Sequence, residues 1–282
     1  MLAYDFDYYL PDTVSEATDI YASLSSAGKQ PYYFGGGTEI ISMSRVYNLK
    51  PDAVIDIKKI PECRHLGTDG ISLYFGSAVT LSAIAESGLF PLLSLAGGRI
   101  ADHTIQCKLT LGGNLAGTVY YHETLPPLLV CDALITIASP GGKIRRETIG
   151  TVLAAGEGLK PGELIVNVSI ENDYVSLPYA HIKKVQIEKI GYPLISVSSV
   201  CKAGVARLAV SGLCAYPVRL GDIPLDGQDE ALLEQSLQRL SKPVLDDMSG
   251  SSQYRTFILK KTIEKIMLYY RQGRSGHAAF SR

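Results

Sequence analysis

Clustered metal ligands are missing from this 282-residue chain. Its five cysteines form no C-x-x-C pair, and their spacings do not gather the four thiolates that an iron–sulfur cluster needs. Its five histidines are scattered and include no H-E-x-x-H pair. The sequence therefore predicts no metal site and free thiols in a reducing compartment. Any cofactor is expected to be organic and bound without a covalent link.

An excess of charge and long apolar runs are missing as well. Lys and Arg total 27 against 28 Asp and Glu, a net charge of −1, which does not favour nucleic acid or an anionic membrane as the main partner. Glu86 and Asp132 interrupt the two longest apolar stretches, so none reaches membrane-spanning length. The first residues turn acidic at Asp5 with no basic stretch before it, unlike a signal peptide. We therefore expect a soluble, cytoplasmic protein without membrane insertion.

Two glycine-rich segments are the most informative feature that is present. The first runs from Tyr33 to Ile40 as Tyr-Phe-Gly-Gly-Gly-Thr-Glu-Ile, and the second runs from Leu109 to Gly117 as Leu-Thr-Leu-Gly-Gly-Asn-Leu-Ala-Gly. Because glycine has no side chain, the backbone N–H groups of such loops approach an anion closely. The pair predicts a pyrophosphate held from both sides. Two ordinary strand-to-helix turns are the alternative interpretation.

Neither loop matches a common nucleotide-binding motif. No lysine followed by serine or threonine comes after the last glycine, as a P-loop requires. Ile40 stands where the Rossmann pattern has its third glycine. A nucleotide bound by these loops would therefore be held by a different motif.

Helix and strand signals alternate in the first half of the chain. Thr13–Glu16 is a capping box that opens a helix to about Ser26. Turn residues at Gly70 and at Pro140–Gly142 predict two hairpins. The other expected elements are short strands at 31–34, 53–57, 64–67, 71–76, 135–138 and 143–146, and helices at 40–46, from 80, at 89–101 and from 126. The alternation is typical of an α/β-like arrangement.

The second half has a different pattern. The glycine-rich residues 156–162 are the candidate break before a strand at 164–170. β-rich runs follow, and two helices, at 229–240 and 252–271, come last. The β-rich runs cover 176–183, 194–202 and 206–215. The chain as a whole is therefore predicted to be a two-domain α+β protein.

Five short motifs are spread along nearly the whole chain. They are Gly36-Gly37-Thr38-Glu39-Ile40, Thr110-Leu111-Gly112-Gly113-Asn114, Pro126-Pro127-Leu128-Leu129 with Asp132-Ala133, Pro161-Gly162-Glu163-Leu164, and Ser251-Ser252-Gln253-Tyr254-Arg255. In their order and spacing, these motifs resemble one family, the flavin-binding (medium) subunits of the molybdenum hydroxylases. That group includes the medium subunits of xanthine dehydrogenase and of aerobic carbon monoxide dehydrogenase.

The resemblance implies a fold and an activity. Residues 1–173 would form a two-subdomain FAD-binding domain of the vanillyl-alcohol-oxidase (PCMH) type, and residues 174–282 a C-terminal domain with a three-stranded antiparallel sheet and helices. FAD would lie extended between the two subdomains. Electrons from [2Fe–2S] clusters on a small partner subunit would pass through FAD to NAD or another acceptor. The organic substrate would be oxidised on a molybdopterin-binding large subunit.

The resemblance also implies which residues hold FAD. The first loop would wrap the diphosphate and ribitol, with a hydroxyl from Thr38, and the second loop would form the opposite wall. Glu123 would hydrogen-bond toward the adenosine half, Ile165 would pack on the ring system, and Lys184 would lie close to the flavin. The full implied set is Tyr33, Phe34, Gly35, Gly36, Gly37, Thr38, Glu39, Ile40, Thr110, Gly112, Gly113, Asn114, Glu123, Ile165 and Lys184. No acid–base residue is expected, because electron transfer needs none.

The chain departs from the family pattern in two places. Ile105-Gln106-Cys107 stands where the family has Ile-Arg-Asn, and residues 187–191 read Ile-Glu-Lys-Ile-Gly where the family has Arg-Arg-x-x-Asp. Losing the arginine removes a rigid bidentate donor that Gln106 replaces only in part. These departures make a flavin-free assembly subunit an alternative function. A stand-alone flavin oxidoreductase of the same fold is another, and it would require a proton donor next to the flavin.

Several side chains near the motifs also have a plainly structural interpretation. Glu39 and Glu123 are suited to capping backbone amides. Tyr120-Tyr121 is suited to a surface or interface role, although it could shield a flavin edge. A buried, inert thiol is expected at Cys107. Tyr254-Arg255 is expected to be a packing and ion-pair element of the last helix.

Overall fold

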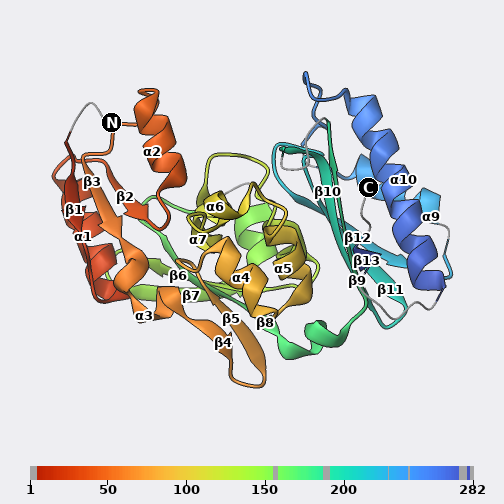
Figure 1. The fold of residues 1–282 in the computed structure, drawn as a ribbon, viewed down its shortest axis with the longest axis horizontal. Helices are drawn as coiled ribbons and strands as arrows, with labels where there is room; N and C mark the ends of the chain where they lie inside the picture. Colours follow the sequence, from red (N-terminus) through yellow and green to blue (C-terminus); the bar gives the residue numbers. More distant parts are fainter. Residues whose placement is uncertain are drawn as a thin grey trace.

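The computed structural model describes residues 5–154, 158–186, 191–227, 229–240, 242–272 and 278–279, and it is an α+β fold built on three sheets arranged in a row (Figure 1). Helices from the middle of the chain lie between the second and third sheets, and the long last helix covers the outer face of the third. In the described part of the chain, no helix is both long enough and apolar enough to cross a membrane.

The first sheet is parallel, in the order β1-β3-β2, with strands β1 Asp7–Tyr9, β3 Ala53–Asp56 and β2 Pro31–Phe34. Helix α1, Val14–Ser26, packs on it, and α2, Thr38–Arg45, follows β2 directly. Thr13 is confirmed as the N-cap of α1, because its Oγ1 accepts a hydrogen bond from Glu16 N at 3.1 Å. The Glu16 carboxylate accepts one from Asp12 N at 2.8 Å.

The second sheet is antiparallel, in the order β4-β5-β8-β6-β7. Both predicted hairpins are confirmed, because β4 pairs with β5 across Gly70 and β6 with β7 across Gly141. The strands are β4 Leu66–Thr68, β5 Ser72–Gly76, β6 Leu134–Ser139, β7 Lys143–Thr148 and β8 Leu164–Glu171. The helices of this region are α3 Pro61–Arg64, α4 Leu81–Ser87, α5 Pro91–Gly97, α6 His103–Gln106, α7 Leu111–Ala116 and α8 Leu125–Leu129.

The third sheet has the order β12-β11-β10-β9-β13 and so contains more than the three strands predicted. Its members are β9 Tyr179–Val185, β10 Pro193–Lys202, β11 Val205–Ser211, β12 Val218–Pro224 and the short β13 Ala278–Ala279. The sequence of β12, Val-Arg-Leu-Gly-Asp-Ile-Pro, mixes charges with glycine and proline and therefore lacks a strand signal. The boundary proposed after residue 173 lies in the turn Asn172–Ser176 between β8 and β9, and the division into domains stays a prediction.

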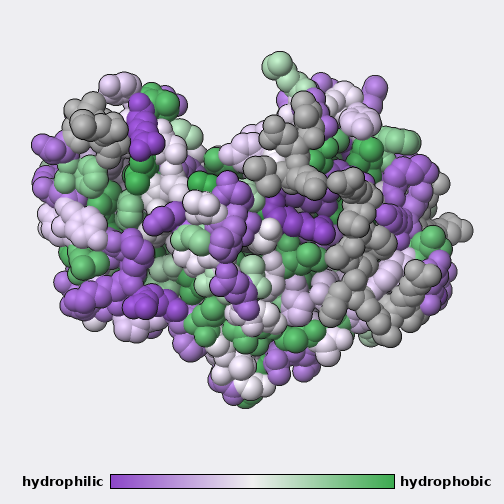
Figure 2. Space-filling model, in the orientation of Figure 1, coloured by the Kyte–Doolittle hydropathy of each residue, from purple (hydrophilic) through white to green (hydrophobic). Residues whose placement is uncertain are grey.

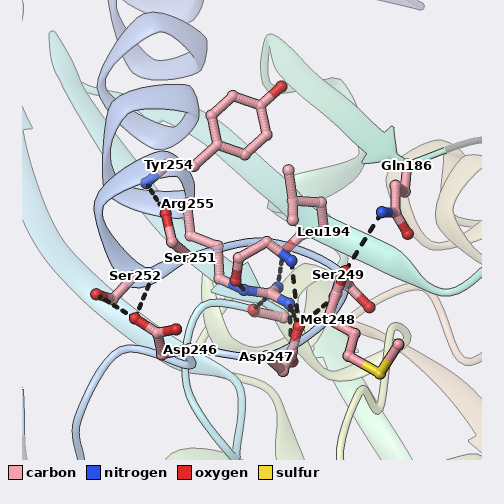
Figure 3. A network of polar contacts seen from close by, with 12 residues as sticks. Gln186, Leu194, Asp246, Asp247, Met248, Ser249, Ser251, Ser252, Tyr254 and Arg255 are labelled. Carbon is pink, nitrogen blue, oxygen red and sulfur yellow. Dashed lines mark hydrogen bonds and ion pairs between the residues drawn. The ribbon is translucent and has the colours of Figure 1, made fainter.

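Helix α10, Ser252–Arg271, has the bounds predicted for it, and a shorter helix, α9 Asp229–Gln238, precedes it. Arg255 on α10 is 0% exposed and lies at the centre of a polar network (Figure 3). Its guanidinium donates to the backbone oxygens of Leu194 at 2.5 Å and Gly212 at 2.7 Å, and to the Asp247 carboxylate at 2.7 Å. The expected packing and ion-pair role of Arg255 is confirmed.

Candidate functional site

A cleft of about 900 Å³ separates the lobe that carries α2 from the C-terminal lobe, where Figure 2 shows the surface hollowed. Both glycine-rich segments contribute to its lining, together with residues 100–101, residues 116–119 and 121–123, and Tyr192 just before β10. The volume lies within the range of small-molecule sites. The cleft is therefore the place where the two predicted loops can act on one ligand.

The first loop opens helix α2 toward the cleft. Gly37 has φ +69° and occupies the N-cap position, and no side chain caps the helix. Within the part of the chain that the structure describes, the N–H groups of Gly36 and Gly37 donate to no protein acceptor. The N–H groups of the first helical turn have no intrahelical partner either. A row of open donors at the positive end of a helix is suited to an anion.

The second loop is held from behind by the segment that precedes α4. Leu81 N donates to Leu109 O at 2.9 Å, and Gly112 N donates to Ser77 O at 2.8 Å. Thr110 Oγ1 caps α7 by accepting from Gly113 N at 3.2 Å. This loop is therefore anchored to the second sheet, while the first belongs to the parallel sheet.

The glycines of the first loop let the two loops touch. A methyl group on Gly36 would lie 1.6 Å from the backbone oxygen of Lys108, and one on Gly35 would lie 2.6 Å from Thr110 Oγ1. Any larger residue at Gly36 would therefore push the loops apart. Gly112 is also tightly packed, but against Ser77, whose Cβ would be 2.6 Å away from such a methyl group.

Glu39 joins the two loops on the other side. Its Oε1 accepts hydrogen bonds from the N–H of Thr118 at 2.8 Å and from the Thr118 hydroxyl at 2.6 Å. Thr118 follows α7, so Glu39 connects the first turn of α2 to the end of the second loop. Glu39 thus binds a backbone amide, as its structural interpretation requires.

Glu123 forms a buried ion pair with Lys183 at the wall of the cleft. Lys183 Nζ donates to Glu123 Oε1 at 3.0 Å and lies 2.9 Å from Oε2, and both side chains are about 5% exposed or less. Burial raises the pKa of Glu123, and the Lys183 charge partly offsets that rise. Oε2 is itself buried, and the Lys183 ammonium is the charged group next to it among the described residues.

Several aromatic side chains that line the cleft stack on one another or on neighbouring rings. Tyr192, which is 66% exposed, stacks on Tyr121 with ring centroids 4.7 Å apart, and Tyr121 in turn contacts Tyr120 at 4.4 Å. His122 stacks on Tyr216 and donates through Nδ1 to the backbone oxygen of Asn114 at 2.7 Å. Burial lowers the pKa of His122, so the ring is neutral near pH 7.

Asn114 organises the turn beneath these rings. Its Oδ1 accepts from Thr124 N at 3.2 Å and from the Thr124 hydroxyl at 2.6 Å. The last residue of the second loop's Gly-Gly-Asn motif therefore fixes the backbone that places Tyr121, His122 and Glu123 against the cleft.

Gln106, which the sequence analysis singled out as a departure from the family pattern, binds three backbone oxygens beside the cleft. Its Nε2 lies 3.0 Å from the backbone oxygens of both Gly98 and Ile100 and 3.3 Å from that of Ala101. Ala101 has φ +53°, a backbone conformation that is strained for any residue other than glycine, and the hydrogen bonds from Gln106 help to hold it. Because residues 100 and 101 line the cleft, Gln106 supports its floor.

The expectation of a buried thiol at Cys107 is wrong. Cys107 is exposed, and its sulfur lies 3.7 Å from His103 Nε2. The residue comes directly after the single turn of α6, where Gln106 takes the inward position and leaves the next side chain facing solvent.

Most of the implied FAD-binding residues meet in the cleft, although no ligand tests their roles. Phe34, Gly112, Ile165 and Lys184 are not among the lining residues. Ile165 is 3% exposed in the core of the second sheet, and Lys184 comes one residue after the buried Lys183. Those that line the cleft are Tyr33, Gly35, Gly36, Gly37, Thr38, Glu39, Ile40, Thr110, Gly113, Asn114 and Glu123.

Sequence reasoning missed several residues that the fold brings to the same place. Tyr32, Ile100, Ala101, Ile105, His122 and Tyr192 line the cleft. The aromatic residues carried a weak signal in the sequence, because exposed tyrosines are common in this chain. Residues 187–190, one of the departures from the family pattern, lie outside the described part, whereas Gly191 next to them lines the cleft.

Known proteins that resemble this chain include FAD-binding subunits of dehydrogenases. Residues 4–171 match the family described as the FAD binding domain in molybdopterin dehydrogenase. The chain is 26% identical over 276 residues to the xanthine dehydrogenase FAD-binding subunit of Escherichia coli O157:H7, with 89% of each chain covered. It is 24% identical over 284 residues to the 6-hydroxypseudooxynicotine dehydrogenase complex subunit alpha of Paenarthrobacter nicotinovorans, with 93% of each covered.

Solved structures share the fold. Carbon monoxide dehydrogenase from Hydrogenophaga pseudoflava superposes with a TM-score of 0.81 at 18% identity, covering 94% of this chain and 96% of that one. Quinoline 2-oxidoreductase from Pseudomonas putida 86 gives a TM-score of 0.82 at 18% identity, covering 98% and 100%. The chain belongs to the family of FAD-binding domains of molybdopterin dehydrogenases, and it is an FAD-binding oxidoreductase subunit of the molybdenum hydroxylase type.

Proposed function

We propose that this chain is the electron-transfer subunit of a molybdenum-containing dehydrogenase, in which electrons from [2Fe–2S] clusters on a partner chain reach FAD here and pass to NAD or another acceptor. When bound, FAD supplies chemistry that accepts electrons singly or in pairs. The protein supplies a site of the right shape and polarity.

The residues of the cleft fit an extended dinucleotide. The open N–H groups of Gly36 and Gly37 and the N-terminus of α2 would hold its diphosphate, and the Thr38 hydroxyl would add a donor. Glu123, which lines the cleft beside Lys183, would accept a hydrogen bond from a hydroxyl or amino group. Tyr121 and Tyr192 would exclude water from an aromatic ring placed against them.

The observation that carries the proposal is how the cleft uses its acids and bases. Glu39, Glu123 and His122 are the carboxylate and imidazole groups among its described lining residues. Glu39 is bonded to Thr118, Glu123 is paired with Lys183, and His122 donates to a backbone oxygen. None of them is placed as a free proton donor, which favours electron transfer over direct reduction of an organic substrate at this site.

A titration of the purified chain with FAD tests the cofactor site. We expect the visible flavin spectrum to reach one FAD per chain. Gly36→Ala should weaken binding about 10- to 100-fold, because relieving the overlap with Lys108 costs on the order of 1–3 kcal/mol or more. Gly97→Ala on α5 is the matched control, since its methyl group meets nothing within 4 Å. A colourless chain that ignores added FAD would contradict the proposal.

Purification of the chain from its native host tests the partners and the path of the electrons. We expect iron, molybdenum and flavin to purify with a tagged chain, and NADH or another donor to reduce the flavin and the iron centres of the complex. A chain that purifies alone, with FAD, and that reduces a small organic substrate would instead be a stand-alone flavin oxidoreductase.

A further inference from the structure

Lys58 reaches the first glycine loop from the side opposite the cleft. It belongs to the turn Ile57–Lys59 after β3, and it is not among the residues that line the cleft. Its Nζ donates to the backbone oxygen of Gly35 at 2.9 Å and lies 4.6 Å from the centre of the Phe34 ring. A single ammonium group thus contacts two consecutive residues of the loop from behind.

The orientation of the Gly35–Gly36 peptide follows from this contact. In a trans peptide, the C=O of one residue and the N–H of the next point in opposite directions. Lys58 does not line the cleft and binds the Gly35 oxygen, so the Gly36 N–H is expected to point the other way, toward the cleft that Gly36 lines. That N–H is one of the open donors at the start of α2.

Phe34 extends the same support to the next residue. A methyl group on Gly37 would lie 2.1 Å from the Phe34 ring, so the ring is packed directly against the Gly37 backbone. Lys58 lies over this ring as a cation–π partner. The absence of Phe34 from the cleft lining is thereby explained, because its ring supports the loop from outside.

Asp56 anchors the lysine. Its side chain is 4% exposed, and it accepts from Lys58 Nζ at 2.6 Å, from Lys58 N at 2.9 Å and from the Tyr8 hydroxyl at 2.5 Å. The hydrogen bond to Asp56 raises the pKa of Tyr8 to about 12, so the hydroxyl stays a neutral donor. Asp56, on the parallel sheet, therefore holds the ammonium group and the backbone N–H of Lys58, and the same ammonium group holds the loop.

We propose that Lys58 is a positioning residue for FAD: from behind the loop, it holds the Gly35–Gly36 peptide so that the N–H groups of Gly36 and Gly37 face the diphosphate. Lys58 acts through the backbone and not as a charge that touches the cofactor. The inference rests on FAD binding in this cleft. FAD binding by the wild type is therefore measured first, so that a failure of the FAD site can be told apart from a failure of the role given to Lys58.

The experiment compares neighbouring lysines. Lys58→Met removes the ammonium and keeps an unbranched stem, and Lys58→Arg keeps a charged donor. Lys59→Met is the matched control, because Lys59 pairs with Asp12 at 2.6 Å and both of these side chains are more than half exposed. Dissociation constants for FAD and for ADP are measured by titration, and the melting temperature of each apoprotein is recorded.

We expect Lys58→Met to weaken the binding of FAD and of ADP by the same factor, about five- to tenfold. Lys58→Arg should bind both ligands nearly as tightly as the wild type, and Lys59→Met should bind them as the wild type does. The loss of affinity should be the same at 50 and 500 mM NaCl. Salt would screen a direct attraction between the lysine charge and the diphosphate, but it would not change how the backbone N–H groups are oriented. Equal binding by wild type and Lys58→Met would overturn the proposal. So would a loss that disappears at high salt, or one that Lys59→Met reproduces. If Lys58→Met does not fold, Lys58→Arg takes its place in the test. The proposal is then overturned if the free energy of FAD binding falls in Lys58→Arg by the same amount as its free energy of unfolding.

Discussion

The first glycine loop and the Arg255 network use polar groups in opposite ways. Arg255 is 0% exposed, and backbone oxygens and a carboxylate surround its guanidinium (Figure 3). At the first loop, the N–H groups of Gly36 and Gly37 face no protein acceptor among the described residues. The network is saturated from within, whereas the loop is held by its carbonyl side and left open on its donor side.

The difference shows where the chain gains stability and where it reserves binding capacity. A buried polar group with all its partners stabilises one arrangement of the chain, and removing one partner leaves the others unsatisfied. A donor without a protein partner gains its hydrogen bond only when a ligand arrives. Substitutions in the network should therefore change stability first, and substitutions in the loop should change FAD affinity first.

Removing the guanidinium at the centre of the network should have the largest effect. We expect Arg255→Met to lower the free energy of unfolding by about 3–5 kcal/mol, because Asp247 and the oxygens of Leu194 and Gly212 lose their donor. Chemical denaturation measures this loss. Lys261→Met on the same helix is the control, since Lys261 pairs with Glu264 at the surface and should cost less than about 0.5 kcal/mol. A small effect at Arg255 would break the contrast.

The same network should respond to acid. Burial by itself would raise the pKa of Asp247, but the hydrogen bond and charge of Arg255, with donors from the backbone of Ser249 and Gly250, bring it below its ordinary value. A carboxylate with a lowered pKa stabilises the fold above its unfolded pKa of about 3.9 and loses that contribution as pH falls through the folded value.

The acid response can be isolated with Asp247→Asn. We expect the difference in unfolding free energy between wild type and this variant, about 1–2 kcal/mol at pH 7, to shrink as pH falls below about 4. In the Arg255→Met background the difference should be small at every pH, because the partner of the carboxylate is gone. A constant difference from pH 7 to pH 3 would show that the ion pair does not stabilise the protein.

Local signals predicted elements in both regions, and they did not predict the contacts between segments that lie far apart in the sequence. The N-cap at Thr13, the two glycine loops and the bounds of α10 each depend on residues close in sequence, and the structure has them as expected. The Arg255 network joins α10 to Gly212, which directly follows β11, and to Leu194 on β10, and these residues lie 43 and 61 positions earlier in the sequence. A sequence pattern indicates that Arg255 pairs, but not with which backbone oxygens.

Strand register explains the site residues that sequence could not place. Neighbouring residues on a strand point to opposite faces of the sheet. An assignment that is wrong by one residue therefore places a side chain in the cleft when it lies in the solvent or in the core. On β9 the buried partner of Glu123 is Lys183, and the neighbouring Lys184, which the resemblance implied to lie close to the flavin, is not among the residues that line the cleft. On β8, Ile165 contributes to the core of the second sheet, whereas Leu164 and Val166 pack toward the first.

The smallest effect should come from one hydroxyl in the open loop. Thr38 is the first residue of α2 and lines the cleft, and its hydroxyl bonds to none of the described residues. Thr38→Val keeps the shape and removes a donor that only a ligand can use. We expect the apoprotein to keep its melting temperature and FAD affinity to fall about two- to fivefold.

Thr256→Val on α10 supplies the contrast, because its hydroxyl already donates to Ser252 O at 2.8 Å and lies in the saturated part of the chain. This variant should bind FAD as the wild type does. If Thr38→Val instead lowered the melting temperature and left FAD affinity unchanged, the hydroxyl would serve the fold, and the donor side of the loop would be less open than its geometry indicates. A loss of affinity without a loss of stability would place Thr38 with the open donors of Gly36 and Gly37, as part of the surface that the fold leaves for the cofactor.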